Sequence, residues 1–258
     1  MTSTTLKLLA LVCMLLDHTA DYIPGAPVWL HWIGRIAAPI FFFCMAWGFH
    51  HTHDRKLYLR RMYFFGVGMA MLDFACNNLY PQPYCFMTNN IFITLFLTGV
   101  ICWILDLWNT DRKRSVKYLL FFALWQLISM ALCVVARNLL PGYGVYDFVG
   151  AITGNLFFSE GGLLFVPLGS MLYLCRNKRK LQAVLYASVS VCLFLAIAAG
   201  GLNAEHLLVE NDQWMMLFAL PFFLLYNGKR GTGLKYFFYI FYPVHILILF
   251  FAGNLMLA

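Results

Sequence analysis

Residues 181–199 read LQAVLYASVSVCLFLAIAA, a stretch without a single charged side chain. A helix needs about 20 such residues to cross the hydrocarbon core of a bilayer. Similar stretches recur along the 258-residue chain, of which 62% is hydrophobic and only 11% charged. A soluble domain usually carries about 25% charged residues to cover its core. The composition therefore excludes a soluble protein and predicts an all-α integral membrane protein, because a spanning helix satisfies its own backbone polar groups.

The apolar stretches predict nine transmembrane helices in a single domain over residues 1–258. These helices are expected at residues 6–23, 29–49, 58–76, 89–108, 117–137, 161–175, 181–200, 213–227 and 235–256. The half-apolar, glycine-containing stretch 147–160 is expected to be re-entrant or interfacial. No cleavable signal peptide is expected, because no small-residue cleavage site follows the first apolar segment.

The basic residues predict the orientation of these helices. Of the 18 Lys and Arg residues, all except Arg35 and Arg137 fall at one alternate set of connections. Such connections usually face the cytoplasm. We therefore expect a multi-pass protein of the cell membrane with a cytoplasmic amino terminus and an extracytoplasmic carboxyl terminus. The net charge of +7 fits anionic lipid headgroups and cytoplasmic polyanions, and no nucleic-acid partner is expected.

Two histidines are expected near the middle of the membrane. Charged and ionisable side chains are costly there and by default mark a site or an internal pair. His18 lies eleven residues after Lys7, about three helical turns, so both share one face of the first helix. His245 lies ten residues after Lys235, at the start of the last helix. At about 1.5 Å per residue, both histidines reach roughly 15 Å from the cytoplasmic surface.

Asp17 and Arg35 are expected at matching depth in the hairpin of the first two helices. Each lies nine residues from Ala26, inside the turn Pro24-Gly25-Ala26-Pro27. The pair could simply hold two helices together, or place a cation beside a reacting group. For Asp73, near the end of the third helix, a solvated or snorkelling position is expected.

Other polar motifs leave more than one interpretation open. His50, His51 and His53 could ligate a metal, but interfacial histidines beside a basic loop are more common, and no metal is expected. Cys76 and Cys85 flank a loop expected outside and could pair there, whereas packing is the default role of the other cysteines. The compact loop from residue 226 to residue 231 could cradle phosphate or form a simple turn.

Several motifs together resemble the TraX family, over nearly the whole chain except residues 110–210. They are Leu6-Lys7, Leu16-Asp17-His18, Gly34-Arg35-Ile36-Ala37-Ala38-Pro39-Ile40-Phe41, Gly48-Phe49, Tyr58-Leu59-Arg60-Arg61, Asn89-Asn90-Ile91-Phe92-Ile93-Thr94-Leu95, Tyr226-Asn227-Gly228-Lys229-Arg230-Gly231 and Lys235-Tyr236-Phe237-Phe238-Tyr239-Ile240-Phe241-Tyr242-Pro243-Val244-His245. TraX-like proteins are similar to the acyltransferase-3 membrane acetyltransferases, whose signature is a basic residue, ten residues and an essential histidine. Lys7 and His18 have that spacing.

The resemblance implies an acetyltransferase that takes acetyl-CoA from the cytoplasm and modifies an extracytoplasmic amine or hydroxyl of a glycan, lipid or protein. His18 is the expected general base. His245 is expected to orient His18 or shuttle its proton, and Arg35, paired with Asp17, or Tyr242 is expected to stabilise the oxyanion. The residues expected to bind acetyl-CoA are Lys7, Asn227, Lys229, Arg230 and Lys235.

Two other classes of function fit the same intramembrane charges. A small ion- or proton-coupled transporter would line its path with Asp17, Arg35 and the histidines. An assembly partner in an envelope complex would use the charged pairs only to pack its helices. The absence of repeated halves in the sequence disfavours the transporter.

Overall fold

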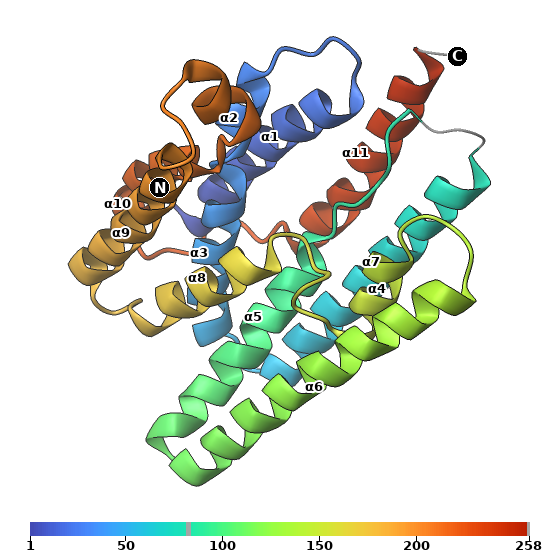
Figure 1. Cartoon of the computed structure of the whole chain (residues 1–258). Coiled ribbons are helices and arrows are strands. Elements are labelled where there is room, and N and C mark those ends of the chain that lie inside the picture. Colours follow the sequence, from blue (N-terminus) through green and yellow to red (C-terminus); the bar gives the residue numbers. More distant parts are fainter. Residues whose placement is uncertain (81–83, 257–258) are drawn as a thin grey trace. The chain divides into compact units, whose positions relative to one another are not determined.

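The computed structural model describes residues 1–80 and 84–256, and within these ranges every regular element is a helix (Figure 1). Cα packing divides the chain into two compact units, which are described separately. The first unit combines Met1–Trp47 with Cys175–Ala258, and the second is Gly48–Leu174. The expectation of one membrane domain over residues 1–258 stays a prediction.

The first unit is built from both ends of the chain. It contains α1 (Ser3–Tyr22), α2 (Trp29–Gly34), most of α3 (Ala37–His50), α9 (Arg179–Ala198), η2 (His206–Glu210), η3 (Gln213–Ala219), α10 (Leu220–Leu225) and α11 (Lys235–Leu255). The second unit contains α4 (Arg55–Leu79), α5 (Ile91–Asp106), η1 (Leu107–Asn109), α6 (Arg112–Leu139), α7 (Val145–Thr153) and α8 (Gly162–Leu174).

Each of the nine predicted segments is helical, and five helical stretches of the described chain are long and apolar enough to cross a membrane. Those five are Trp29–His50, Ile91–Asn109, Arg112–Leu139, Arg179–Ala198 and Tyr236–Leu255. Helix α1 carries Lys7, Asp17 and Asp21, and α8 has only 13 residues. The number of crossings and the side of the amino terminus therefore stay predictions.

The second predicted segment is broken between α2 and α3, which the sequence prediction missed. Pro39 lies in the first turn of α3. A proline ring lacks an N–H and clashes with the carbonyl four residues earlier, here that of Arg35. The break at Arg35 and Ile36 follows from this clash. Side-chain caps start three of the other helices, since Thr2, Asp54 and Asp111 each accept a hydrogen bond from the backbone N–H three residues on.

Helices α1 and α11 pack in parallel. Near their starts, Lys7 Nζ of α1 lies 5.9 Å from the ring centroid of Phe238 of α11. At their far ends, Gly253 lies against α1 so closely that a Cβ there would be 1.9 Å from the carbonyl oxygen of Tyr22. Because the contacts follow the same order along both helices, the two helices begin on the same side. The prediction of nine spans agrees with this, because an odd number of spans also places the starts of the first and last helices on the same side.

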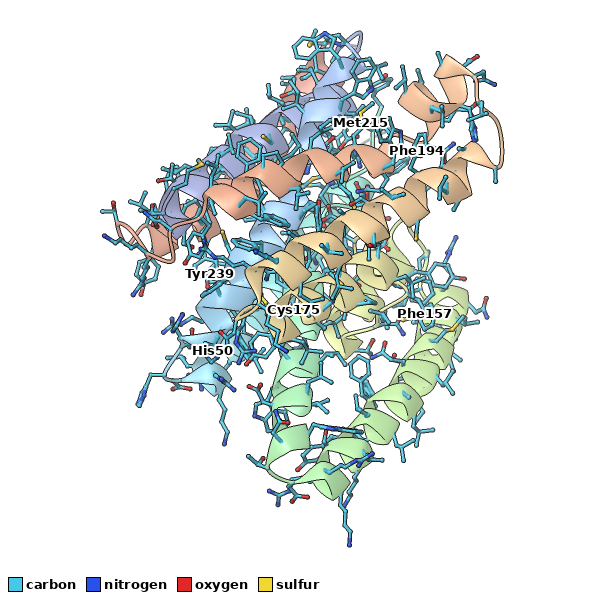
Figure 2. All side chains as sticks on the ribbon, turned by 90° about the vertical axis from the view of Figure 1, so that its left-hand side faces the viewer. His50, Phe157, Cys175, Phe194, Met215 and Tyr239 are labelled. Carbon is cyan, nitrogen blue, oxygen red and sulfur yellow. The ribbon has the colours of Figure 1, made fainter. Side chains whose placement is uncertain are left out.

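Elements η3 and α9 pack together at one end of the first unit. The rings of Phe194 and Trp214 lie 5.1 Å apart between centroids, and Figure 2 shows Met215 close to Phe194. The hydroxyl of Tyr186 donates to the carbonyl of Met216. This packing fixes the start of η3, where Asp212 and Gln213 lie.

In the second unit, α4, α5, α7 and α8 share one core. Its buried members are Ala70, Ile93, Leu97, Ala151 and Val166. The predicted re-entrant stretch 147–160 contains most of α7 and the loop that follows it. No disulfide joins Cys76 to Cys85.

A polar network holds the loop after α7. The side chain of Asn155 is fully buried, donates to the hydroxyl of Ser129 at 2.7 Å and accepts from the N–H groups of Phe157 and Phe158. Gln126 accepts from the N–H of Leu156 at 2.7 Å. Side chains therefore supply hydrogen-bond partners for the backbone N–H groups of this loop.

Replacing Asn155 with alanine is expected to lower the free energy of unfolding by about 2–4 kcal/mol, since it leaves buried N–H groups without acceptors. Thermal unfolding of the purified variant in detergent measures this loss. The matched control is Asn138→Ala, because Asn138 is exposed on α6 of the same unit. Equal stability of the two variants would contradict the network.

Candidate active site

His18 of α1 and His245 of α11 meet inside the first unit. His18 Nδ1 lies 2.8 Å from His245 Nε2, and the rings are nearly parallel, with 5° between their planes. Their side chains are buried, with only 3% and 5% exposed. The predicted meeting of the two histidines is confirmed.

The hydrogen bonds of this pair define which nitrogen carries each proton. His245 Nδ1 lies 2.8 Å from the carbonyl oxygen of Phe241, which can only accept, so Nδ1–H donates. In a neutral ring His245 Nε2 then has a lone pair, and it accepts from Nδ1–H of His18. His18 Nε2 is therefore the unprotonated nitrogen. The chain of hydrogen bonds therefore fixes the orientation of the His18 ring.

Aromatic rings fix the orientation of the histidine pair. The ring of Tyr242 lies edge-on to His18, with centroids 6.2 Å apart, and Tyr22 lies edge-on at 6.5 Å. The ring of Phe241 stacks on His245 at 4.8 Å. The structure thus brings three of the predicted catalytic residues together, His18, His245 and Tyr242.

Asp17 and Arg35 form the predicted ion pair. Arg35 Nη2 lies 3.1 Å from Asp17 Oδ1. A second carboxylate, that of Asp212, lies 3.2 Å from Arg35 Nε, and Arg35 Nη1 donates to Gln213 Oε1 at 3.3 Å. Two carboxylates and an amide therefore hold the guanidinium.

Asp17 is engaged away from His18. Its Oδ1 accepts from His31 Nδ1 at 2.9 Å as well as from Arg35. Adjacent helical residues point about 100° apart, so Asp17 and its neighbour His18 face different partners. Gly34 permits this packing, because a Cβ there would be 2.3 Å from the side chain of Asp17.

The predicted phosphate-binding loop lies at the amino terminus of α1. The N–H of Thr4 donates to the carbonyl of Arg230 at 3.0 Å, and the N–H of Asn227 donates to the carbonyl of Met1 at 2.9 Å. Asn227 Oδ1 accepts from the N–H of Lys229 at 3.0 Å. The loop carbonyls thus satisfy N–H groups in the first turn of α1.

The cations of this loop point outward, whereas Lys7 is half-buried. Lys229 and Arg230 are exposed, and Lys7 Nζ lies 5.9 Å from the ring centroid of Phe238. Lys7, Lys229 and Arg230 therefore lie at the same end of α1 and α11. On α1, Lys7 lies eleven residues, or about three turns, before His18 and on the same face. The side chain of Lys235 lies outside the described residues.

Sequence reasoning missed several residues of these sites. Arg179 of α9 donates to the carbonyl of Tyr226 at 2.5 Å and so holds the predicted phosphate loop. His31 lies four residues before Arg35, a helical spacing that could have revealed it. Asp212 is far away in the sequence, and only the packing of η3 brings it to Arg35.

The expectation for Asp73 is wrong. Its side chain is only 7% exposed, and it lines a cavity of the second unit instead of reaching solvent. The packing of α7 and of the loop before α8 over α4 causes this burial. Within the described parts of the chain, no three His, Cys, Asp or Glu side chains are grouped to hold a metal ion, the cluster at His50 included.

The fold and the site define an all-helical protein with several helices suited to a membrane and a buried histidine pair between its first and last helices. A family model described as TraX protein matches residues 2–252, and the chain belongs to this family. The chain is 27% identical to the probable fimbrial assembly protein FimC, serogroup H1, of Dichelobacter nodosus, over 95% of this chain and 92% of that protein. No solved structure matches the chain.

Proposed function

We propose that the protein is a membrane acetyltransferase that moves an acetyl group from cytoplasmic acetyl-CoA to an amine or hydroxyl outside the cytoplasm. The observation that carries this proposal is the chain of hydrogen bonds from Phe241 through His245 to His18. A buried imidazole with one nitrogen held and the other unprotonated is suited to general-base catalysis. A purely structural histidine needs no second histidine to orient it.

In the proposed reaction, His18 Nε2 takes the proton of the acceptor N–H or O–H as that atom attacks the acetyl carbonyl carbon. A new carbon–nitrogen or carbon–oxygen bond forms, the carbon–sulfur bond of the thioester breaks, and CoA leaves as the thiolate. The imidazolium of His18 then returns the proton to the thiolate. Because the base is regenerated, no other reactant is needed.

Tyr242 is the better of the two predicted groups for the oxyanion. Its ring lies beside His18. Arg35 instead lies between the carboxylates of Asp17 and Asp212, which neutralise its field. We therefore assign Arg35 and Asp17 to positioning α1 against α2.

The nucleotide end of acetyl-CoA is proposed to bind at the start of α1 and α11. Lys7, Lys229 and Arg230 lie there, and cations of this kind bind phosphate through charge-assisted hydrogen bonds. Asn227 shapes the loop by accepting from the N–H of Lys229. The thioester would extend along the face of α1 that carries both Lys7 and His18.

A fimbrial subunit is the acceptor to test first. The relative from Dichelobacter nodosus is named as a probable fimbrial assembly protein. An exported subunit offers amines and hydroxyls on the expected outer side. Lipids and glycans are the other acceptors to compare.

Acetyl-CoA should raise the unfolding temperature of the purified protein, because a ligand that binds only the folded state stabilises it. Purified protein incubated with labelled acetyl-CoA and acceptor should also transfer the label. Stabilisation by acetyl-CoA but not by ATP separates an acetyltransferase from a transporter or an assembly partner. No stabilisation and no transfer would contradict the proposal.

Replacing Lys7 with alanine is expected to weaken acetyl-CoA binding by about 10–100-fold, since one charge-assisted hydrogen bond contributes roughly 1.5–3 kcal/mol. Titration of the purified variant with acetyl-CoA gives the dissociation constant. Lys113→Ala is the matched control, because Lys113 is exposed in the second unit. Unchanged affinity of Lys7→Ala for acetyl-CoA would show that Lys7 does not bind the phosphates.

A further inference from the structure

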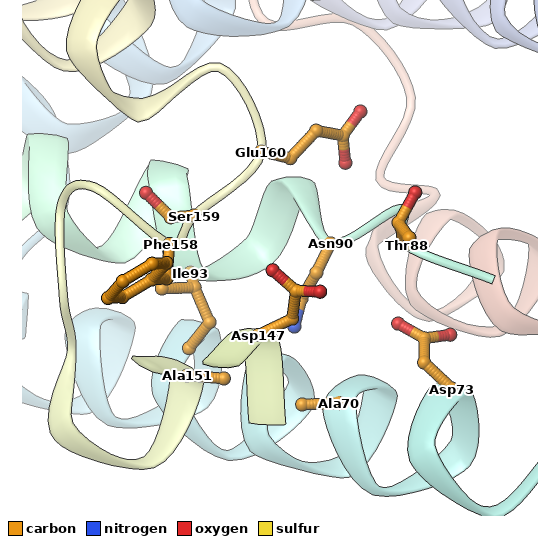
Figure 3. Close-up of a pocket in the computed structure, with 10 residues that line it drawn as sticks. All are labelled: Ala70, Asp73, Thr88, Asn90, Ile93, Asp147, Ala151, Phe158, Ser159 and Glu160. Carbon is orange, nitrogen blue, oxygen red and sulfur yellow. The ribbon is translucent and has the colours of Figure 1, made fainter. Parts of the chain in front are cut away.

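Several side chains that carry oxygen atoms line a cavity inside the second unit (Figure 3). The cavity is bounded by α4, the start of α5, α7 and the loop before α8. Its polar lining includes Asp73, Asn90, Asp147 and Glu160. The cavity has room for about one water-sized group.

Asp73 lines this cavity and is itself buried. Only 7% of the residue is exposed, and its Oδ1 has no hydrogen-bond partner. A buried carboxylate is costly unless it is paired and hydrogen-bonded. Figure 3 shows Asp73 on α4 and Asp147 on α7 among the residues that line the cavity.

A second buried oxygen has no partner in the same cavity. Asn90 is 8% exposed, and its Nδ2 donates to the carbonyl of Gly66 at 2.8 Å. This bond identifies the other amide atom as the oxygen, and that Oδ1 has no hydrogen-bond partner. Two buried acceptors, one of them a carboxylate, thus lack donors.

The lining holds no side chain that could compensate this charge. Its remaining polar members are the hydroxyl groups of Thr88 and Ser159, and no Lys, Arg or His lines the cavity. Asp147 is exposed and Glu160 is half-buried, so two further carboxylates line the cavity. The missing complement is a small cation that donates hydrogen bonds.

We infer that this cavity binds the primary ammonium group of an organic amine. A –NH₃⁺ group is close to water in size and has three donors, enough for Asp73 Oδ1 and Asn90 Oδ1 with one left for Asp147. A metal ion fits less well, because no three His, Cys, Asp or Glu side chains of the described residues are grouped closely enough to hold one. The inference does not depend on acetyl transfer.

Methylammonium chloride is the probe, and tetramethylammonium chloride at the same concentration is its control. Both carry one positive charge, but tetramethylammonium is larger and has no N–H. At about 100 times its dissociation constant, methylammonium is expected to raise the unfolding temperature of the purified protein by on the order of 5–10 °C. Tetramethylammonium should leave it unchanged.

Asp73→Asn keeps the shape of the side chain and removes its charge. It is expected to weaken methylammonium binding by about 10–100-fold, the effect of one charge-assisted hydrogen bond. The variant loses a buried charge and is therefore expected to fold at least as stably as the parent chain. Asp111→Asn, at an exposed position of the same unit where asparagine also caps a helix, should bind like the parent chain.

Four results would overturn the inference. Equal stabilisation by both ammonium salts would indicate general charge screening. Stabilisation by sodium or calcium chloride alone would indicate a metal site. No stabilisation by methylammonium would show that Asp73 is held as a neutral carboxylic acid without a ligand. Unchanged binding in Asp73→Asn would show that methylammonium binds elsewhere.

Discussion

Replacing His18 with alanine is expected to slow acetyl transfer by about 10²–10⁴-fold, the usual contribution of a positioned general base. The reason is that His18 carries the only nitrogen of the pair that is unprotonated and not already hydrogen-bonded within it. Acetyl-CoA binding should change little, because the proposed phosphate contacts lie three turns away. Transfer of labelled acetyl groups by purified variants measures the effect.

His53→Ala is the control for this variant. His53 is exposed at the cytoplasmic end expected for α3 and contributes nothing to the pair. It should therefore transfer acetyl groups at the parent rate. If His18→Ala remains folded, binds acetyl-CoA and retains full turnover, then His18 is not the base.

Replacing Gly253 with alanine is expected to cost about 1–3 kcal/mol of stability, the usual range for overpacking, and to reduce acetyl transfer as well. The added Cβ would lie 1.9 Å from the carbonyl oxygen of Tyr22. Neither a Cβ nor a backbone carbonyl oxygen moves when a side chain changes its rotamer, so no rotamer change relieves the clash. Helix α11 must move away from α1, and His245 moves with it.

Gly68→Ala is the matched control for Gly253→Ala. A Cβ at Gly68 of α4 would meet nothing within 4 Å. Alanine is preferred over glycine in a helix by roughly 0.5–1 kcal/mol, so this variant should be at least as stable as the parent chain. Thermal unfolding and transfer assays on both variants give the comparison. A Gly253→Ala protein with parent stability and turnover would contradict the close contact of α1 and α11.

Simple helix geometry was enough to predict the central contacts. Rise per residue placed His18 and His245 at one depth, and symmetry about Ala26 placed Asp17 opposite Arg35. Both contacts are confirmed, at 2.8 Å and 3.1 Å. Such predictions succeed because depth along a helix depends only on counting residues.

Which residues cover a helix from the side does not follow from counting. Asp73 lies near the end of α4 and was expected to reach solvent, but α7 and the loop after it bury its carboxylate. Asp212 reaches Arg35 only because η3 packs on α9. The break after α2 was readable in principle, since Pro39 marks it.

The most direct test of the central claim is a double-mutant cycle in acetyl transfer with His18→Ala, His245→Ala and the two combined. If His245 acts only by orienting His18, its loss costs nothing once His18 is gone, because residues that act as a unit are not additive. The double variant should then be as slow as His18→Ala alone. Two separate penalties that multiply in the double variant would contradict a single hydrogen-bonded base.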